Sequence, residues 1–194
     1  MNYNPVKLVV ICIAAFYSFT MLAQNSTIDS LQKRLEIVSV NEKPVVLNNL
    51  AEEFLKLSDN KAEILANEAI VLSQKNNDVN EEAHGYKIKS SCYINFGRIE
   101  EALFASKRAL EIYLRNGKLK NVAEVYNQLG IIYKQKRDFY KSQESFTKAI
   151  EYYGMVRDSS GIARAKTPSS TNQWACLRVR QSFELDREAG RSFA

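Results

Sequence analysis

The chain has 194 residues, of which 45% are apolar and 25% are charged, which is enough for one folded domain with its own core. Seven glycines and three prolines are few for a protein built from many strands and tight turns, so the composition favours helices. The formal net charge is +5, but charges of both signs are interspersed and no long basic block occurs. This distribution argues against a nucleic-acid-binding surface.

The first segment with a distinct character is an apolar run at the N-terminus. Residues 8–23 follow Lys7 and contain 16 residues without a charge, whereas a membrane span needs about 20. The pattern is typical of a signal peptide over residues 1–23 that is cut after Ala23, and it predicts a periplasmic or secreted protein. Met21 stands where a small residue is preferred. The alternative is therefore an uncleaved segment that anchors the protein in the inner membrane, facing the periplasm.

A leading helix is expected next, within residues 24–40. Ile28, Leu31, Leu35 and Val38 recur at helical intervals and form one apolar face. Because the end of a stacked array of helices needs a cover, we expect this helix to cap the segment that follows.

From residue 41 to residue 162 the chain repeats itself with a period of about 40 residues. The clearest matches under this shift are Ala83 with Ala123, Tyr86 with Tyr126, Tyr93 with Tyr133, Ala109 with Ala149, and Tyr113 with Tyr153. A slightly shorter copy lies upstream, so three units are predicted, at about residues 41–80, 81–120 and 121–162. A period of this length is typical of stacked helix pairs.

Gly130 shows how the two helices of a unit are expected to meet. A glycine inside a helix costs roughly 1 kcal/mol relative to alanine, so close approach of a second helix must offset that cost. The second helices carry small residues at the matching face, namely Ala62, Ala69, Ala102, Ala109, Ser142 and Ala149. Asp138 is expected to cap the last of these helices, and Asn60 with Glu63 predicts a capping box at the first.

These residues resemble the signature of the tetratricopeptide repeat, a family of helix–turn–helix units. The matching residues in the third unit are Tyr126, Leu129, Gly130, Tyr133, Ser142, Phe146 and Ala149. The second unit departs from the signature with Lys89, Ser90 and Ser106, and Gly154 replaces the usual proline of the third unit. The resemblance implies an all-α fold, an α-solenoid of three stacked antiparallel helix pairs with a leading helix.

The repeat pattern does not continue into residues 163–194. Lysine and serine replace the aromatic and Leu-Gly signals, and Pro168 stands where a helix interior would be. This segment is either a natural irregular cap or unrelated sequence that replaces further repeats, and we expect little order after Thr167. In the second case, the open face of the third repeat would be available for self-association.

The search for chemistry finds no catalytic or cofactor-binding set. Neighbouring carboxylates such as Glu100 and Glu101 point about 100° apart on a helix and cannot converge as an acid–base pair. The single histidine, His84, has no nucleophile motif beside it, and no Gly-rich phosphate loop occurs. Cys92 and Cys176 lie 84 residues apart and form no metal-binding motif. We therefore predict a protein that is not an enzyme and that needs no cofactor or metal.

The predicted architecture instead offers a concave groove lined by the first helix of each pair. Its expected lining is Asn48, Glu52, Leu55, His84, Lys87, Ser91, Ile94, Glu124, Asn127, Ile131 and Lys134. Asparagine side chains can bond a peptide backbone and lysines can hold a carboxylate. Lys87, Asn127 and Lys134 resemble part of the set with which some tetratricopeptide domains grip a C-terminal carboxylate.

Two functions follow from these observations. The first is an exported interaction module that binds a peptide or partner protein in its groove. The second rests on resemblance: in certain bacterial membrane proteins, tetratricopeptide repeats outside the inner membrane form the sensory region of a histidine kinase or helix-turn-helix regulator. The chain would then be the input part of such a protein.

Overall fold

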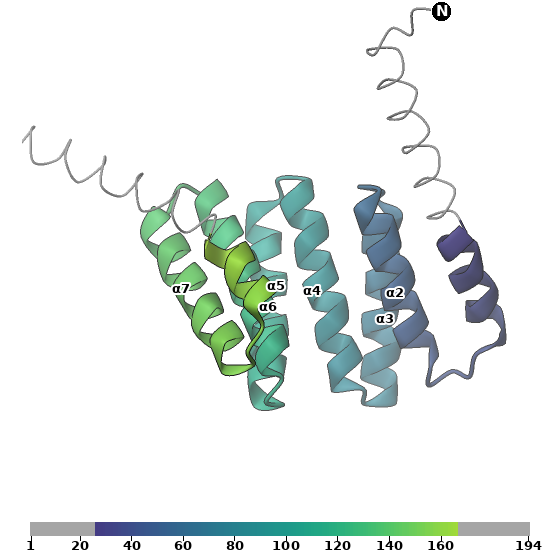
Figure 1. Ribbon diagram of the computed structural model, residues 1–194. Coiled ribbons are helices and arrows are strands. Elements are labelled where there is room, and N and C mark those ends of the chain that lie inside the picture. The colour runs from purple at the N-terminus through teal and green to yellow at the C-terminus, as the bar shows by residue number, and fades with distance from the viewer. Residues whose placement is uncertain (1–25, 167–194) are drawn as a thin grey trace, which may run out of the picture.

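The computed structural model describes residues 26–166, and this part of the chain consists of helices and short turns without a strand (Figure 1). Six helices have defined caps: α2 (Lys43–Lys56), α3 (Lys61–Asn76), α4 (Val79–Asn95), α5 (Ile99–Arg115), α6 (Leu119–Gln135) and α7 (Phe139–Met155). Two further helices, over residues 26–37 and 159–166, flank them.

Consecutive helices form three packed pairs, α2 with α3, α4 with α5, and α6 with α7. Each pair also packs against the next, and the first helices contact one another, α2 with α4 and α4 with α6. Figure 1 shows the pairs side by side in chain order. The predicted α-solenoid of three stacked antiparallel helix pairs is confirmed.

The turns between helices repeat one backbone pattern. After α5, the Lys118 N–H donates to the carbonyl of Tyr113 (3.0 Å) and the Gly117 N–H donates to the carbonyl of Leu114 (3.3 Å). This is a Schellman motif, and it places Gly117 at a φ of +65°. The same pair of bonds ends α4, α6 and α7, although Arg137 after α6 and Arg157 after α7 take the left-handed position in place of glycine.

The predicted helix caps are partly correct. The Asp138 carboxylate accepts a hydrogen bond from the N–H of Lys141 (3.1 Å), which confirms the cap of α7. The capping box predicted at Asn60 is wrong, because the Asn60 side chain makes no cap hydrogen bond. Instead, Asp59 accepts a hydrogen bond from the N–H of Lys61 (2.9 Å), one residue earlier than predicted.

The core lies between the two helices of each pair, where the predicted small residues are fully buried. A Cβ atom built on Gly130 would lie 2.6 Å from the ring of Phe146, so the glycine is required by the close approach of α7. The hydroxyl of Ser142 donates to the Gly130 carbonyl (2.6 Å). The prediction of close packing is confirmed, but an aromatic ring fills most of the space that only small residues were expected to occupy.

The leading helix covers the outer side of the first pair. Ile28 is buried in a cluster with Leu50 and Phe54 of α2, and Leu31 packs against the same cluster. The predicted apolar face of this helix is therefore directed at the first repeat.

The helix over residues 159–166 begins 40 residues after α6, as α6 begins 40 residues after α4. Its Asp158 cap accepts a hydrogen bond from the N–H of Gly161 (2.9 Å), and Ala165 is fully buried against Tyr153 and its neighbours. The helix crosses the boundary predicted at residue 163, so the first four residues of the predicted irregular tail are helical. The rest of that tail lies outside the described residues.

No helix between residues 26 and 166 is both long and apolar enough to cross a membrane. The predicted signal peptide or anchor, residues 1–23, lies outside the described part of the chain.

Candidate functional site

The first helices α2, α4 and α6 lie next to one another and share one face, on which the predicted groove residues fall. All eleven of these residues lie on the expected helices. Ten of them are half-buried, and the exception is Asn48.

Asn48 is fully buried and is not an accessible groove residue, which corrects the prediction. Its side-chain Nδ2 donates to the carbonyl oxygen of Glu81 (3.0 Å) and to the Glu81 carboxylate (2.8 Å). These bonds join α2 to α4, because α4 approaches α2 closely enough at Gly85 that a Cβ there would lie 3.3 Å from the Asn48 side chain. Asn48 thus helps to hold two first helices together.

His84 stands between two carboxylates on this face. Its Nε2 lies 2.8 Å from Glu52 of α2, and its Nδ1 lies 3.5 Å from Glu81 of its own helix. Burial alone would lower the pKa of His84, but the hydrogen bonds to Glu52 and Glu81 outweigh it and raise the pKa above its ordinary value. The bond to His84 also lowers the pKa of Glu52 and of Glu81. These contacts therefore favour the imidazolium form of His84 and the ionised forms of Glu52 and Glu81.

The same kind of contact joins α4 to α6. The ammonium of Lys87 lies 2.8 Å from Glu124. Gln128 donates to the hydroxyl of Ser91 (2.6 Å) and to the carbonyl of Lys87 (3.1 Å). The sequence analysis does not single out Gln128, although it follows the predicted groove residue Asn127 directly. We call the Glu52–His84, Lys87–Glu124 and Ser91–Gln128 contacts the groove ladder.

The remaining groove residues differ in what they offer. Leu55, Ile94 and Ile131 pack against the edges of the core. The side-chain oxygen of Asn127 is buried and has no hydrogen-bond partner within residues 26–166. Lys134 is half-buried on the same helix, one turn beyond Ile131. Asn127 therefore holds an acceptor that no described residue uses.

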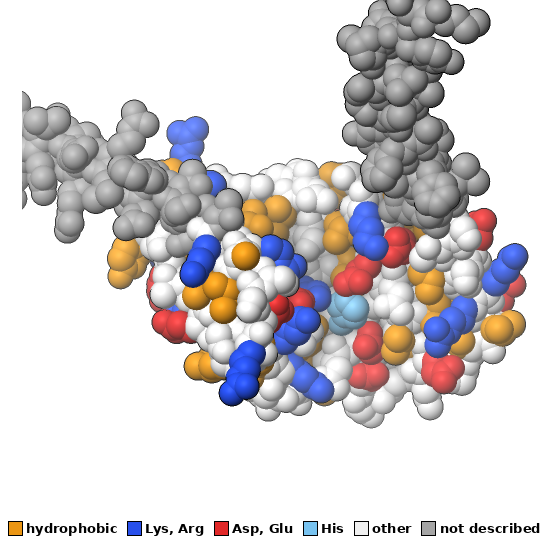
Figure 2. Space-filling view, in the orientation of Figure 1, with side chains coloured by type: hydrophobic (Ala, Val, Ile, Leu, Met, Phe, Trp, Pro, Cys, Tyr) orange, Lys and Arg blue, Asp and Glu red, His pale blue; other side chains and the backbone are white. Residues whose placement is uncertain are grey.

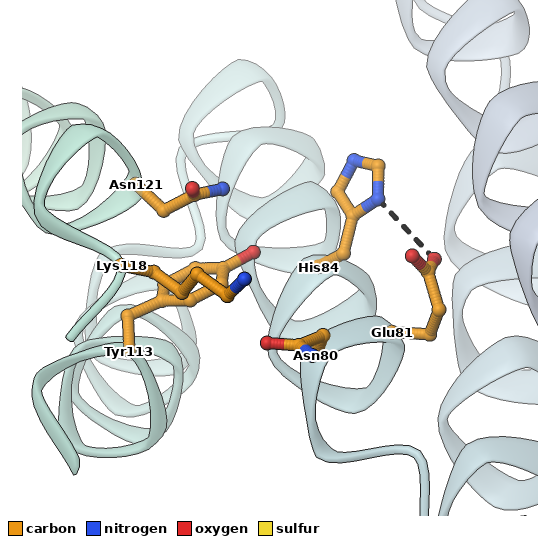
Figure 3. A pocket seen from close by; sticks show the side chains of 6 residues that line it. All are labelled: Asn80, Glu81, His84, Tyr113, Lys118 and Asn121. Atoms are coloured by element: carbon orange, nitrogen blue, oxygen red, sulfur yellow. Dashed lines mark ion pairs between the residues drawn. The ribbon is translucent and has the colours of Figure 1, made fainter. Parts of the chain in front are cut away.

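A small pocket of about 240 Å³ lies between the N-terminal ends of α4 and α6 (Figure 3). It is lined by Asn80, Glu81, His84, Tyr113, Lys118 and Asn121. Of these residues, only His84 is predicted from the sequence. The other five come together because the 40-residue period places the starts of α4 and α6 beside each other, with the end of α5 behind them. Asn121 follows Glu81 by one period, and that is the signal by which it could have been found.

The described residues contain no cluster of three or more His, Cys, Asp or Glu side chains that could hold a metal ion. Cys92 is buried as a free thiol, and its burial raises the pKa to about 11. A thiol with such a pKa is protonated at neutral pH and is a weak nucleophile, so Cys92 acts as a small apolar core residue. Cys176 lies outside residues 26–166.

The stacked helix pairs and the shared face of their first helices define a helical-repeat protein of the tetratricopeptide-like class, a fold that serves protein–protein interaction. Residues 55–171 match the family described as SNAP, soluble NSF attachment protein, and the chain belongs to this family. No curated protein matches the chain. One similar solved structure is that of BtubC (BKLC) from P. vanneervenii, with 21% identity and a TM-score of 0.58 over 83% of this chain and 72% of that chain. This likeness concerns the fold alone.

Proposed function

We propose that the chain binds an extended segment of a partner protein along the face of α2, α4 and α6, and that it does no chemistry of its own. The family supports this proposal in its coarser form, because SNAP-type helical repeats are protein-interaction scaffolds. The finer part, the use of the concave face, rests on the geometry of the groove ladder.

The observation that carries the proposal is the unpartnered side-chain oxygen of Asn127. A buried acceptor without a partner costs about 1–3 kcal/mol, and a peptide N–H would remove that cost. The groove ladder fixes α6, which carries Asn127, against α4, so Asn127 is already positioned before a partner arrives. Such preorganisation reduces the entropy that binding must overcome.

A photo-crosslinking residue in place of Lys134 tests this proposal in the full chain within its native cell. We expect a discrete crosslinked partner from this position, and none when the same residue replaces Lys107, which is exposed on the second helix α5. Asn127→Ala should lower the yield at position 134 while the helical circular dichroism stays unchanged. Crosslinks from position 107 with none from position 134 would contradict the use of this face.

Export belongs to the same proposal. The supporting observation is the apolar run of residues 8–23 after Lys7. The intact mass of the native protein distinguishes the possibilities: a soluble protein that starts at residue 24 indicates cleavage and export. A membrane-bound species that keeps residues 1–23 indicates an anchor. A larger membrane-bound species with the same repeats would favour the sensory-region alternative.

A further inference from the structure

The pocket between α4 and α6 differs in chemistry from the groove ladder beside it. In the ladder, two of the three contacts pair groups of opposite charge, Glu52 with His84 and Lys87 with Glu124. In the pocket, Figure 3 shows the Tyr113 hydroxyl, the Lys118 ammonium and the Asn121 amide on one side, facing His84 and Asn80 across a gap. Glu81 is the one acidic side chain of the lining, and it contacts His84 (3.5 Å). Tyrosine hydroxyls, ammonium groups and amide nitrogens are hydrogen-bond donors, so the side of the pocket formed by Tyr113, Lys118 and Asn121 is suited to an acceptor.

Tyr113 is the strongest indication that a ligand is missing from this pocket. The residue is only 2% exposed, and its hydroxyl makes no hydrogen bond of ordinary geometry within the described chain, although the Asn121 amide beside it acts to lower its pKa. Burial raises the pKa of Tyr113 far above its ordinary value, so the hydroxyl keeps its proton at neutral pH and can donate. Buried hydroxyls are nearly always bonded, and an oxygen atom of a ligand would satisfy this one.

The start of α6 adds positive potential at the same place. The N-terminus of α6 has no side-chain cap and no acidic residue in its first turn, and Lys118 occupies the cap position. By contrast, α4 begins with the capping carboxylate of Asp78 and carries Glu81 and Glu82 in its first turn. The exposed N–H groups of a helix start favour an anion, and at α6 no side chain of the helix supplies one.

We propose that this pocket binds a single carboxylate of the partner segment. The carboxylate accepts hydrogen bonds from Tyr113 and Asn121 and pairs with Lys118. A dianion such as phosphate is disfavoured, because the Glu81 carboxylate lines the pocket and the Glu52 carboxylate contacts His84 from α2. Figure 2 places the histidine at the middle of this face, with basic side chains on its α6 side and acidic side chains on its α2 side. The carboxylate would therefore lie towards α6.

The carboxylate can come from an acidic side chain or from a chain terminus, and capped single amino acids separate these sources. N-acetyl-glutamate N-methylamide carries only the side-chain carboxylate, N-acetylglycine carries only the terminal one, and N-acetyl-glutamine N-methylamide is the neutral match. Each probe is titrated into the ¹⁵N-labelled full chain. We expect at least one carboxylate probe to cause saturable shifts of the amide signals of Lys118, Asn121 and His84. The probe that binds more tightly identifies the source.

Tyr113→Phe removes only the hydroxyl and keeps the ring, so it should weaken binding of the carboxylate probe about tenfold. Lys118→Gln should weaken it by a smaller factor, because this side chain is exposed. Lys107→Gln, at an exposed position on α5, is the matched control and should change nothing. Equal shifts with the glutamine probe, tighter binding of inorganic phosphate, or affinity unchanged in Tyr113→Phe would each overturn the proposal.

The inference rests on the proposed function, but the two can fail separately. Probe binding concerns the pocket alone, whereas crosslinking at position 134 concerns the whole face. If crosslinking at position 134 succeeds and no probe binds, the face is used and the carboxylate proposal is wrong. If the probes bind and crosslinking occurs only at position 107, the pocket stands and the groove proposal is wrong.

Discussion

The second and third repeats have different residue pairs at the same buried contact between their two helices. In the third repeat, Gly130 of α6 meets the ring of Phe146 of α7. In the second repeat, Ser90 of α4 meets Ser106 of α5, and their hydroxyl oxygens lie 2.5 Å apart. A large ring needs a partner without a side chain, whereas two small polar residues need each other. The comparison shows that helix spacing is set by a pair of residues and not by either residue alone.

The largest expected effect is the loss of the ring in the third repeat. Phe146→Ala should lower the free energy of unfolding by about 3–5 kcal/mol, because it removes a fully buried aromatic side chain and leaves a cavity against Gly130. Urea denaturation followed by circular dichroism measures this change. Tyr140→Ala on the same helix, where the side chain is 79% exposed, should change it by less than about 0.5 kcal/mol. A small loss at Phe146 would show that the two helices close over the gap.

A substitution of Gly130, on the other side of the same contact, should have the second largest effect on stability. Gly130→Ala should cost about 1–3 kcal/mol in denaturation, since the new Cβ would lie 2.6 Å from the Phe146 ring and force it to move. Gly154→Ala is the matched control in α7, where a Cβ meets nothing within 4 Å, and it should stabilise the protein by about 0.5–1 kcal/mol. Equal effects of the two changes would mean that spacing does not depend on Gly130.

The hydroxyl pair of the second repeat should behave differently, because its two members depend on each other. The Ser90 hydroxyl also lies 3.2 Å from the Ala102 carbonyl oxygen, and either hydroxyl can donate in the Ser90–Ser106 contact. Ser90→Ala or Ser106→Ala should each cost about 1 kcal/mol, and the double variant should cost less than the sum. A double-mutant cycle by urea denaturation measures the coupling. Strict additivity would mean that the hydroxyls contribute nothing to each other.

The smallest expected effect concerns His84 and appears in the pH dependence of stability. Since the folded pKa of His84 is raised, its contribution is complete below the unfolded pKa of about 6.5 and is lost as the pH rises through the folded pKa. The thermal midpoint of the native protein should therefore fall more between pH 6 and pH 8 than that of His84→Gln, by an amount that corresponds to about 1 kcal/mol or less. Parallel profiles of the two proteins would exclude an ion pair with Glu52 and Glu81.

The fold is predictable from this sequence because its signals are periodic. Matched alanines and tyrosines at a spacing of 40 residues determine the number of helix pairs, their order and the face on which the groove residues fall. The departures at Ser90 and Ser106 do not disturb this prediction, because the pair remains complementary. The helix that starts at residue 159, after the cap formed by Asp158, is harder to recognise. It corresponds to the first helix of a fourth unit, but the positions of the repeat signature come later in the chain, where lysine and serine replace the expected residues.

The site is less predictable, because its members come from different periods. Asn48 satisfies the periodic rule for the groove yet is buried by the close approach of α4 at Gly85. Tyr113 matches Tyr153 in sequence, but Gly161 lies against the Tyr153 ring, whereas Asn121 occupies the equivalent position beside Tyr113. The two helix starts thus meet the preceding tyrosine with different residues, and only the packing of the helices reveals the difference.

The helices of the array are joined by turns with the same hydrogen-bond geometry. Each Schellman motif sets the angle at which the following helix departs, and a residue added to the turn would change that angle. The pocket lies at the turn of Gly117 and Lys118, and its lining includes Tyr113 of α5 before the turn and Asn121 of α6 after it. The length of a three-residue connection therefore determines whether the two walls face each other, and a single-residue insertion there would separate them while leaving every helix intact.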